Sequence, residues 1–296
     1  MIPKEFFKHI HQLEITTKRL VTDLFAGEYE SIFKGRGIEF SEVREYQVGD
    51  DIRSIDRNVT ARMNRAYTKR YVEERELTIM FLVDLSNSSA FGSTDRTKRE
   101  FAAEISALLA YSAFHNQDKI GLLLFSDRVE KYLAPKKGRL HLLEIIRDLL
   151  YFNPQGKGTD INLALKFLNR VIPHRCIVFI ISDFIAKDFW KLLRITFKRH
   201  DTICIVVQDR CESVLPQAGL VEFEDAETGE IQVFNTFHGA LVKDFEKRAR
   251  VRTTELFEKF FAIGLDAIPI TVGEPYVQPL MKFFRMRQRR QGLHAA

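Results

Sequence analysis

The chain has 296 residues, of which 45% are hydrophobic and 29% are charged. This composition is typical of a globular protein and excludes wholesale disorder, and the length allows one large domain or one domain with an appendage. The formal net charge is +5, but residues 275–296 hold five basic residues and no acid, so residues 1–274 sum to zero. A nucleic-acid-binding face on the main body is therefore not predicted.

The sequence also predicts where the protein resides. No stretch approaches the roughly 20 apolar residues of a membrane helix, and the N-terminal stretch MIPKEFFKHIHQLEI lacks the hydrophobic core of a signal peptide. Three cysteines, Cys176, Cys204 and Cys211, lack metal-type spacing, and their odd number does not suit a disulfide framework. We therefore expect a cytoplasmic protein without a membrane span.

Residues 1–76 are predicted to form an N-terminal extension. Apolar residues at helical spacing predict one or two helices within residues 3–33. The stretch 36–76 alternates over short distances and is dense in charge, which predicts an irregular β-ribbon with a short helix.

The segment LTIMFLVDLSNSS, residues 77–89, begins the main domain, predicted to span residues 77–273. Its apolar run is typical of a strand buried on both faces of a parallel sheet. The run ends in Asp84, and hydroxyls follow at Ser86 and Ser88. Ligands of such sheets bind at the carboxyl ends of the strands, which is where this D-x-S-x-S unit falls.

Strands and helices then alternate to the end of the chain. Thr97 and Glu100 have the spacing of a capping box at the start of a helix. Strands are predicted over 119–127, 129–135, 176–184, 202–209 and 267–273, with a hairpin over 220–234. Helices are predicted over 97–115, 139–150, about 162–172 and about 237–262, and between the strands 176–184 and 202–209, where the helix ends at about 199. This order predicts an α/β fold: a doubly wound, mainly parallel sheet with helices on both faces.

Residues 274–296 are predicted to form a basic C-terminal helix. Its arginines interleave with Phe283, Phe284 and Met286. An apolar face that packs on the body is a better explanation of this pattern than nucleic-acid binding.

The chemistry of the D-x-S-x-S unit favours a hard cation. One carboxylate and two hydroxyls supply oxygen ligands only, which suits magnesium or manganese. A capped strand-to-helix turn explains the motif equally well when it is taken alone. Two further oxygen donors follow predicted strands: Thr159 in the turn GKGTD, and Asp183 at the end of CIVFIISDF.

The GKGT segment also invites comparison with a phosphate-binding loop, but the pattern G-x-x-x-x-G-K-[ST] is absent because Lys157 lies between the glycines. The glycines are expected to let the loop approach the first motif closely. Asp160 is expected to cap the next helix, with a role as a spare ligand as the alternative.

The three pieces in this order resemble the metal-ion-dependent adhesion site of von Willebrand factor A domains. The resemblance implies that five residues surround one divalent cation, some directly and some through water, with a position left open for a partner's carboxylate. These residues are Asp84, Ser86, Ser88, Thr159 and Asp183. Magnesium is the expected cation, with manganese or calcium as alternatives.

A second resemblance includes the region before the metal motif. The order G-x-E-F…R-x-Y-x-x-G-D-D-x-R-x-I-D resembles the bacterial "domain of unknown function 58" family of von Willebrand A-like proteins. The matching residues are Gly37, Glu39, Phe40, Arg44, Tyr46, Gly49, Asp50, Arg53, Ile55 and Asp56. The family usually has tryptophan where this chain has Arg57 and often has methionine where it has Ser89; neither position is an expected ligand.

This resemblance implies a non-enzymatic interaction module that works with a MoxR-type AAA+ ATPase on an unknown client protein. The alternative is a metal-dependent phosphohydrolase that uses Asp84 as its nucleophile. Phosphatases of the haloacid dehalogenase type carry a second carboxylate two residues further on, where this chain has Ser86.

Overall fold

The computed structural model describes residues 38–47, 55, 57–63, 65–73, 76–224 and 231–293. The helices predicted within residues 3–33 lie outside this part of the chain. At its centre is a six-stranded sheet. In spatial order its strands are β10 (Asp266–Thr271), β7 (Asp201–Gln208), β6 (Ile177–Ser182), β3 (Thr78–Asp84), β4 (Lys119–Phe125) and β5 (Val129–Lys136).

The sheet is mainly parallel. Neighbouring strands from β10 to β4 pair in parallel, and β5 pairs antiparallel with β4 as the far half of a hairpin. Residues of β3 alternate between two cores: Phe81 and Val83 face one hydrophobic cluster, and Met80 and Leu82 face the other. A strand covered on both faces needs an apolar residue at every position, as the sequence of β3 indicates.

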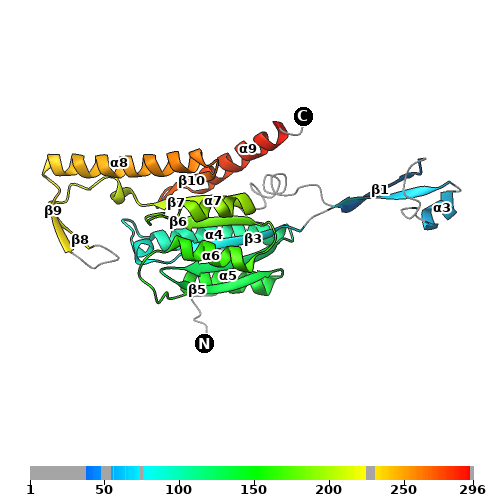
Figure 1. The fold of residues 1–296 in the computed structure, drawn as a ribbon, viewed down its shortest axis with the longest axis horizontal. Helices are drawn as coiled ribbons and strands as arrows, with labels where there is room; N and C mark the ends of the chain where they lie inside the picture. Colours follow the sequence, from blue (N-terminus) through cyan, green and yellow to red (C-terminus); the bar gives the residue numbers. More distant parts are fainter. Residues whose placement is uncertain are drawn as a thin grey trace.

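Helices cover both faces (Figure 1), which confirms the predicted doubly wound fold. One cluster is completed by α4 (Lys98–His115), α5 (Arg139–Tyr151) and α9 (Val277–Leu293). The other is completed by α6 (Ile161–Val171), α7 (Trp190–Arg199) and the C-terminal part of α8 (Gly239–Ala262).

The predicted packing of the basic C-terminal helix is confirmed. Leu280, Phe283 and Phe284 of α9 are buried in the first cluster. On the same helix Arg287 pairs with Asp201 at the start of β7. Part of the positive charge of this segment is thus neutralised by acids at the amino ends of the strands.

Two smaller elements project from the body, at opposite ends of Figure 1. One is an antiparallel ribbon of β1 (Ile38–Glu45) and β2 (Tyr67–Glu73) with the short helix α3 (Arg57–Met63), as predicted for this stretch. The other is a hairpin of β8 (Leu220–Glu224) and β9 (Ile231–Asn235), which leads into the far end of α8. No helix within the described ranges is both long and apolar enough to cross a bilayer.

The strand order locates the place where a ligand is expected. From β3 the chain moves outward through β4 and β5 on one side, and later through β6, β7 and β10 on the other. The direction of winding therefore reverses between β3 and β6. In open α/β sheets a crevice forms at such a switch point, beyond the carboxyl ends of the strands.

Candidate metal centre

The first motif forms a tight polar turn at the end of β3. Asp84 is only 2% exposed, and its Oδ1 accepts a hydrogen bond of 2.9 Å from the Ser86 backbone N–H. The short 3-10 helix η3 (Asn87–Ala90) follows and places the Ser88 hydroxyl 3.0 Å from that of Ser86. The turn therefore gathers one carboxylate and two hydroxyls at the switch point.

The neighbouring strand β6 holds the other oxygen of Asp84. The Ser182 hydroxyl donates a 2.6 Å hydrogen bond to Asp84 Oδ2 and accepts one from the Phe184 backbone N–H. Burial, followed by the negative charge of Asp183, raises the pKa of Asp84 to about 6, although the bonds from Ser182 and Ser86 lower it. A positive charge at this place would relieve the cost of ionising Asp84.

Asp183, directly after β6, is also buried. Its Oδ1 accepts a bond of 3.0 Å from the Ile185 backbone N–H, and its Oδ2 lies 2.7 Å from the Lys98 ammonium group. Lys98 also pairs with Glu212 in the 3-10 helix η4 (Arg210–Glu212). The carboxylates of Asp84, Asp183 and Glu212 outnumber the one ammonium group among them, and a divalent cation would offset this excess of negative charge.

Lys98 is a part of the site that sequence reasoning missed. It is 2% exposed; burial works against its charge, but Asp183 and Glu212 outweigh that effect and raise its pKa. The predicted capping box is confirmed and makes Lys98 the first residue of α4. A lysine there opposes the helix dipole, and this mismatch was the available signal that the residue has a buried acidic partner.

The loop that carries Thr159 is fastened to the rest of the site at two points. Glu130 on β5 accepts a 2.7 Å bond from the Gly156 backbone N–H, and the Lys157 carbonyl accepts a 2.9 Å bond from the Asn87 backbone N–H in the first motif. A Cβ added at Gly156 would lie 2.2 Å from the Ser126 hydroxyl, so only glycine fits there. The predicted close approach of this loop is therefore confirmed.

Thr159 presents a buried hydroxyl without a hydrogen-bond partner among the described residues. An unpaired buried hydroxyl costs about 1–3 kcal/mol, so a native protein is expected to provide it with a partner. The next residue, Asp160, behaves differently: its side chain accepts a bond of 3.0 Å from the Leu163 backbone N–H and caps α6, as predicted.

The backbone is strained beside Asp183. Phe184 has a φ of 57°, which is uncommon for a bulky residue and costs about 1–3 kcal/mol. The Phe184 ring packs against those of Phe189 and Phe260, with ring centroids 5.9 and 5.2 Å away. This packing holds the turn in which the Ile185 N–H reaches Asp183.

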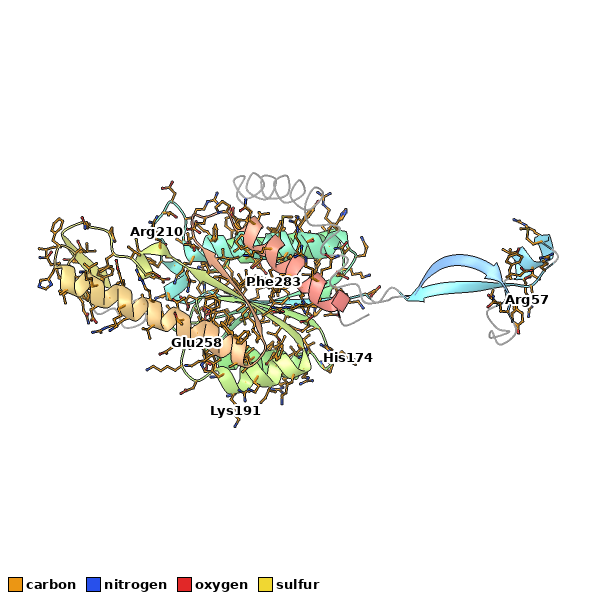
Figure 2. All side chains as sticks on the ribbon, turned by 90° about the horizontal axis from the view of Figure 1, so that it is seen from above. Arg57, His174, Lys191, Arg210, Glu258 and Phe283 are labelled. Carbon is orange, nitrogen blue, oxygen red and sulfur yellow. The ribbon has the colours of Figure 1, made fainter. Side chains whose placement is uncertain are left out.

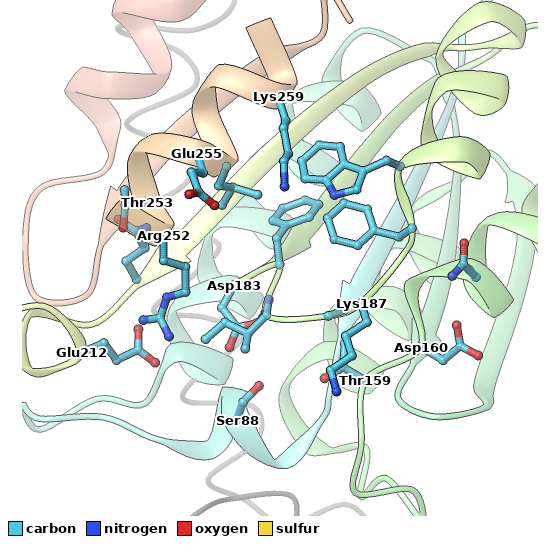
Figure 3. Close-up of a pocket in the computed structure, with 18 of the residues that line it drawn as sticks. Ser88, Thr159, Asp160, Asp183, Lys187, Glu212, Arg252, Thr253, Glu255 and Lys259 are labelled. Atoms are coloured by element: carbon cyan, nitrogen blue, oxygen red, sulfur yellow. Dashed lines mark hydrogen bonds between the residues drawn. The ribbon is translucent and has the colours of Figure 1, made fainter. Parts of the chain in front are cut away.

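A pocket of about 840 Å³ opens over the site. Ser88, Thr159 and Asp183 lie at one end of it, and α8 forms the opposite wall (Figure 3). Asp84 and Ser86 lie beneath this end, linked to it through Ser88 and Ser182. The structure thus brings together all five residues that the sequence singled out.

The donor set fits a small divalent cation. It consists of two carboxylates and three hydroxyls, all oxygen donors, and includes the unpaired hydroxyl of Thr159. Within the described ranges, no three His, Cys, Asp or Glu side chains form a cluster that suits a metal ion. A site rich in nitrogen or sulfur ligands is therefore not indicated in this part of the molecule.

The geometry gives the phosphohydrolase alternative little support. Both oxygens of Asp84 accept hydrogen bonds within the protein, and the side chain is almost fully buried. Ser86 occupies the place where that class of enzyme has its second carboxylate. A nucleophile needs an accessible oxygen, and the Asp84 carboxylate presents none.

The comparison with protein families agrees with the sequence motif. The profile of the family described as "Protein of unknown function DUF58" matches residues 42–255. The chain belongs to this family. The resemblance based on the residues before and within the D-x-S-x-S strand is thereby confirmed.

Relatives and structural neighbours are also found. Uncharacterized proteins of Mycobacterium bovis and Mycobacterium tuberculosis are 28% identical over 283 residues, which is 95% of this chain and 89% of theirs. BatB from Bacteroides thetaiotaomicron is 13% identical with a TM-score of 0.46, over 72% of this chain and 99% of its own. The VWA domain of SpRpn10 is 12% identical with a TM-score of 0.40, over 70% of this chain and 94% of its own.

Proposed function

We propose that this protein is a non-enzymatic protein-interaction module that holds a divalent cation at the carboxyl end of its central sheet. The proposed ligands are Asp84, Ser86, Ser88, Thr159 and Asp183, some acting directly and some, such as the buried Asp84, through water. Magnesium is the first candidate, and manganese and calcium are the alternatives. The observation that carries the proposal is the buried, unpaired hydroxyl of Thr159, which lines the same pocket as Ser88 and Asp183.

The residues around these ligands would orient them. Ser182 and the Ser86 backbone fix the carboxylate of Asp84, and Lys98 fixes that of Asp183. When bound, the cation would supply an exchangeable coordination position for an acidic side chain of a partner. Hydrogen bonds of this kind, made to the ligands and not to the metal, hold the ligands in place and tune the affinity for the metal.

The proposed partner is a MoxR-type AAA+ ATPase, together with a client protein of unknown identity. This choice is supported by the family to which the chain belongs, because resemblance to that family implies a partner of this kind. The ATPase activity would reside in the partner, because the present sequence carries no Walker A pattern. We further propose a cytoplasmic protein that binds no nucleic acid, in keeping with the neutral sum of residues 1–274.

The test is capture of the purified MoxR-type ATPase of the same organism on the immobilised full chain. We expect capture in magnesium, release by EDTA, and loss of capture with Asp84→Asn, which removes the charge and keeps the shape of the side chain. Ser89→Ala is the matched control, because this hydroxyl already donates a 2.6 Å bond to the Ser86 carbonyl.

Two results would contradict the proposal. One is equal capture of wild type and Asp84→Asn in magnesium and in EDTA. The other is magnesium-dependent hydrolysis of p-nitrophenyl phosphate that disappears with Asp84→Asn, since this would restore the phosphohydrolase alternative.

A further inference from the structure

The pocket extends far beyond the candidate cation site. Its volume is about 840 Å³, whereas a water molecule takes up about 30 Å³ of liquid. A single carboxylate group bound to the cation would therefore fill only a small part of the pocket. Besides Ser88, Thr159 and Asp183, its lining includes residues from the loop after β6 and from one face of α8. A ligand that fills it must reach from the cation site to α8.

The face of α8 toward the pocket carries positive charge. Arg252 and Lys259 are exposed, line the pocket and form no ion pair with any residue that the structure describes. In Figure 3, Arg252 extends from the helix toward Glu212 at the cation end. Nearer the start of α8, away from the pocket, Arg248 pairs with Asp244 at 2.6 Å. Arg252 and Lys259 thus lack an ion-pair partner on α8, whereas Arg248 has one.

The wall that faces α8, formed by the loop after β6 and the start of α7, adds an exposed apolar surface and another cation. Ile185 is 40% exposed, and Trp190 lines the pocket beneath the ammonium group of Lys259, 5.5 Å from the ring centroid. Lys187 is exposed on the same loop. The pocket therefore offers apolar contact between the cation site and the positive charges of α8.

Most of the acids that line the pocket are bound by other groups of the protein. Asp183 and Glu212 bind Lys98, and Asp160 caps α6. Glu255 is the remaining acid in the lining, against Lys187, Arg252 and Lys259. Figure 3 places Arg252 and Lys187 at the cation end, whereas Lys259 lies at the far end, over the Trp190 ring. The far end of the pocket thus presents a positive charge, which suits a ligand with a second negative group.

We propose that the pocket binds an acidic segment of a partner protein in which an apolar residue separates two carboxylates. The first carboxylate would bind the cation, which rests on the proposed function. The apolar side chain would lie against Ile185 and Trp190. The second carboxylate would pair with Lys259, which makes α8 the element that selects among acidic partners.

Trp190 provides the readout, because it is the single tryptophan of the sequence and lines the pocket. Its fluorescence in the full chain is followed while unlabelled peptides without tryptophan are added in magnesium. The peptides contain Asp-Leu-Glu, Asp-Leu-Gln, Asn-Leu-Glu or Asp-Ser-Glu between glycine-serine flanks. Citrate serves as a small polycarboxylate for comparison.

We expect Asp-Leu-Glu to bind more tightly than the other three peptides and than citrate. Exposed ion pairs are weak, so Lys259→Glu should weaken its binding by about three- to tenfold, charge repulsion included. This variant should not alter the binding of Asp-Leu-Gln by more than about twofold. Lys247→Glu is the matched control, an equal change of charge at an exposed position of α8 outside the pocket lining.

Several outcomes would overturn the inference. They are equal binding of Asp-Leu-Glu and Asp-Leu-Gln, an equal effect of Lys247→Glu and Lys259→Glu, binding that does not depend on magnesium, and citrate that binds as tightly as the peptide. If magnesium does not stabilise wild type, the proposed function is contradicted, and not only the inference about α8. A persistent magnesium effect with no preference for the doubly acidic peptide contradicts only the role of α8.

Discussion

The two ends of the central sheet deal with buried polar groups in different ways. Figure 2 marks the amino end by His174 and the carboxyl end by Arg210. At the amino end, Nε2 of the buried His200 ring has no hydrogen-bond partner within the described part of the chain, and burial, followed by Arg199 and Arg175, lowers its pKa to about 4. At the carboxyl end, the Thr159 hydroxyl likewise has no partner among the described residues, and it lies in a site with two buried carboxylates.

The difference separates a structural solution from a functional one. A buried histidine avoids most of the cost of burial by remaining neutral. The carboxylates at the other end keep a lysine among them and open into a pocket, which leaves room for an added cation. The following predictions test this distinction, from the largest expected effect to the smallest.

Loss of the internal cation should have the largest effect. Lys98→Met leaves the buried Asp183 and the partly exposed Glu212 without their common partner, and breaking a buried pair such as Lys98–Asp183 costs about 3–5 kcal/mol of the free energy of unfolding. Urea unfolding measures this loss, and magnesium should restore part of it. Lys191→Met, on the exposed surface of α7, should change the free energy by less than about 0.5 kcal/mol. Equal effects of the two substitutions would contradict the assignment of a charged, buried Lys98.

Two identical substitutions compare an unpaired with a paired hydroxyl. Without magnesium, Thr159→Val should leave the free energy of unfolding unchanged or raise it by about 1 kcal/mol, because a buried hydroxyl without a partner is removed. Thr196→Val should lower it by about 1–3 kcal/mol, since that hydroxyl bonds to Leu192 and Asn169. Chemical denaturation of both variants checks this.

The cation reverses the expectation for Thr159. In magnesium, Thr159→Val should lose much of the stabilisation that wild type gains, whereas Thr196→Val should retain it. If Thr159→Val destabilises the protein without magnesium as much as Thr196→Val does, the hydroxyl of Thr159 has a partner within the protein.

The amino end should respond to acid. Because the folded protein lowers the pKa of His200, its contribution to stability is complete above the unfolded value of about 6.5 and is lost as the pH falls toward about 4. Wild type should therefore lose a few degrees more of its midpoint temperature over this range than His200→Asn. Parallel pH profiles of the two proteins would show that His200 is not held neutral by burial.

The sequence was sufficient for the local parts of this account. The apolar run before Asp84 predicted a strand buried on both faces, and strand-end positions singled out Thr159 and Asp183. The resemblance to the adhesion site of von Willebrand factor A domains implied that both share one site with Asp84. The local inferences depend on the period of the apolar residues, the length of each apolar run and the turn residues that follow it, which are properties of short segments.

The rest depends on distant packing. Lys98 reaches Asp183 and Glu212 across 85 and 114 residues of sequence, and α8, which contacts the edge strand β10, lines the pocket. Which helix covers the carboxyl end, and which of its faces turns inward, follows from the assembled fold. Local patterns therefore found the proposed ligands but not the residues that position them or line the approach.

The most direct test of the central claim is the effect of magnesium on thermal unfolding of wild type, Asp84→Asn and Ser89→Ala. At about one hundred times its dissociation constant, a bound ion adds about 2.7 kcal/mol to the stability of the folded state. We predict a clear rise in the midpoint temperature for wild type and Ser89→Ala and none for Asp84→Asn. The absence of a shift in wild type, or an equal shift in Asp84→Asn, would contradict a cation site built on Asp84.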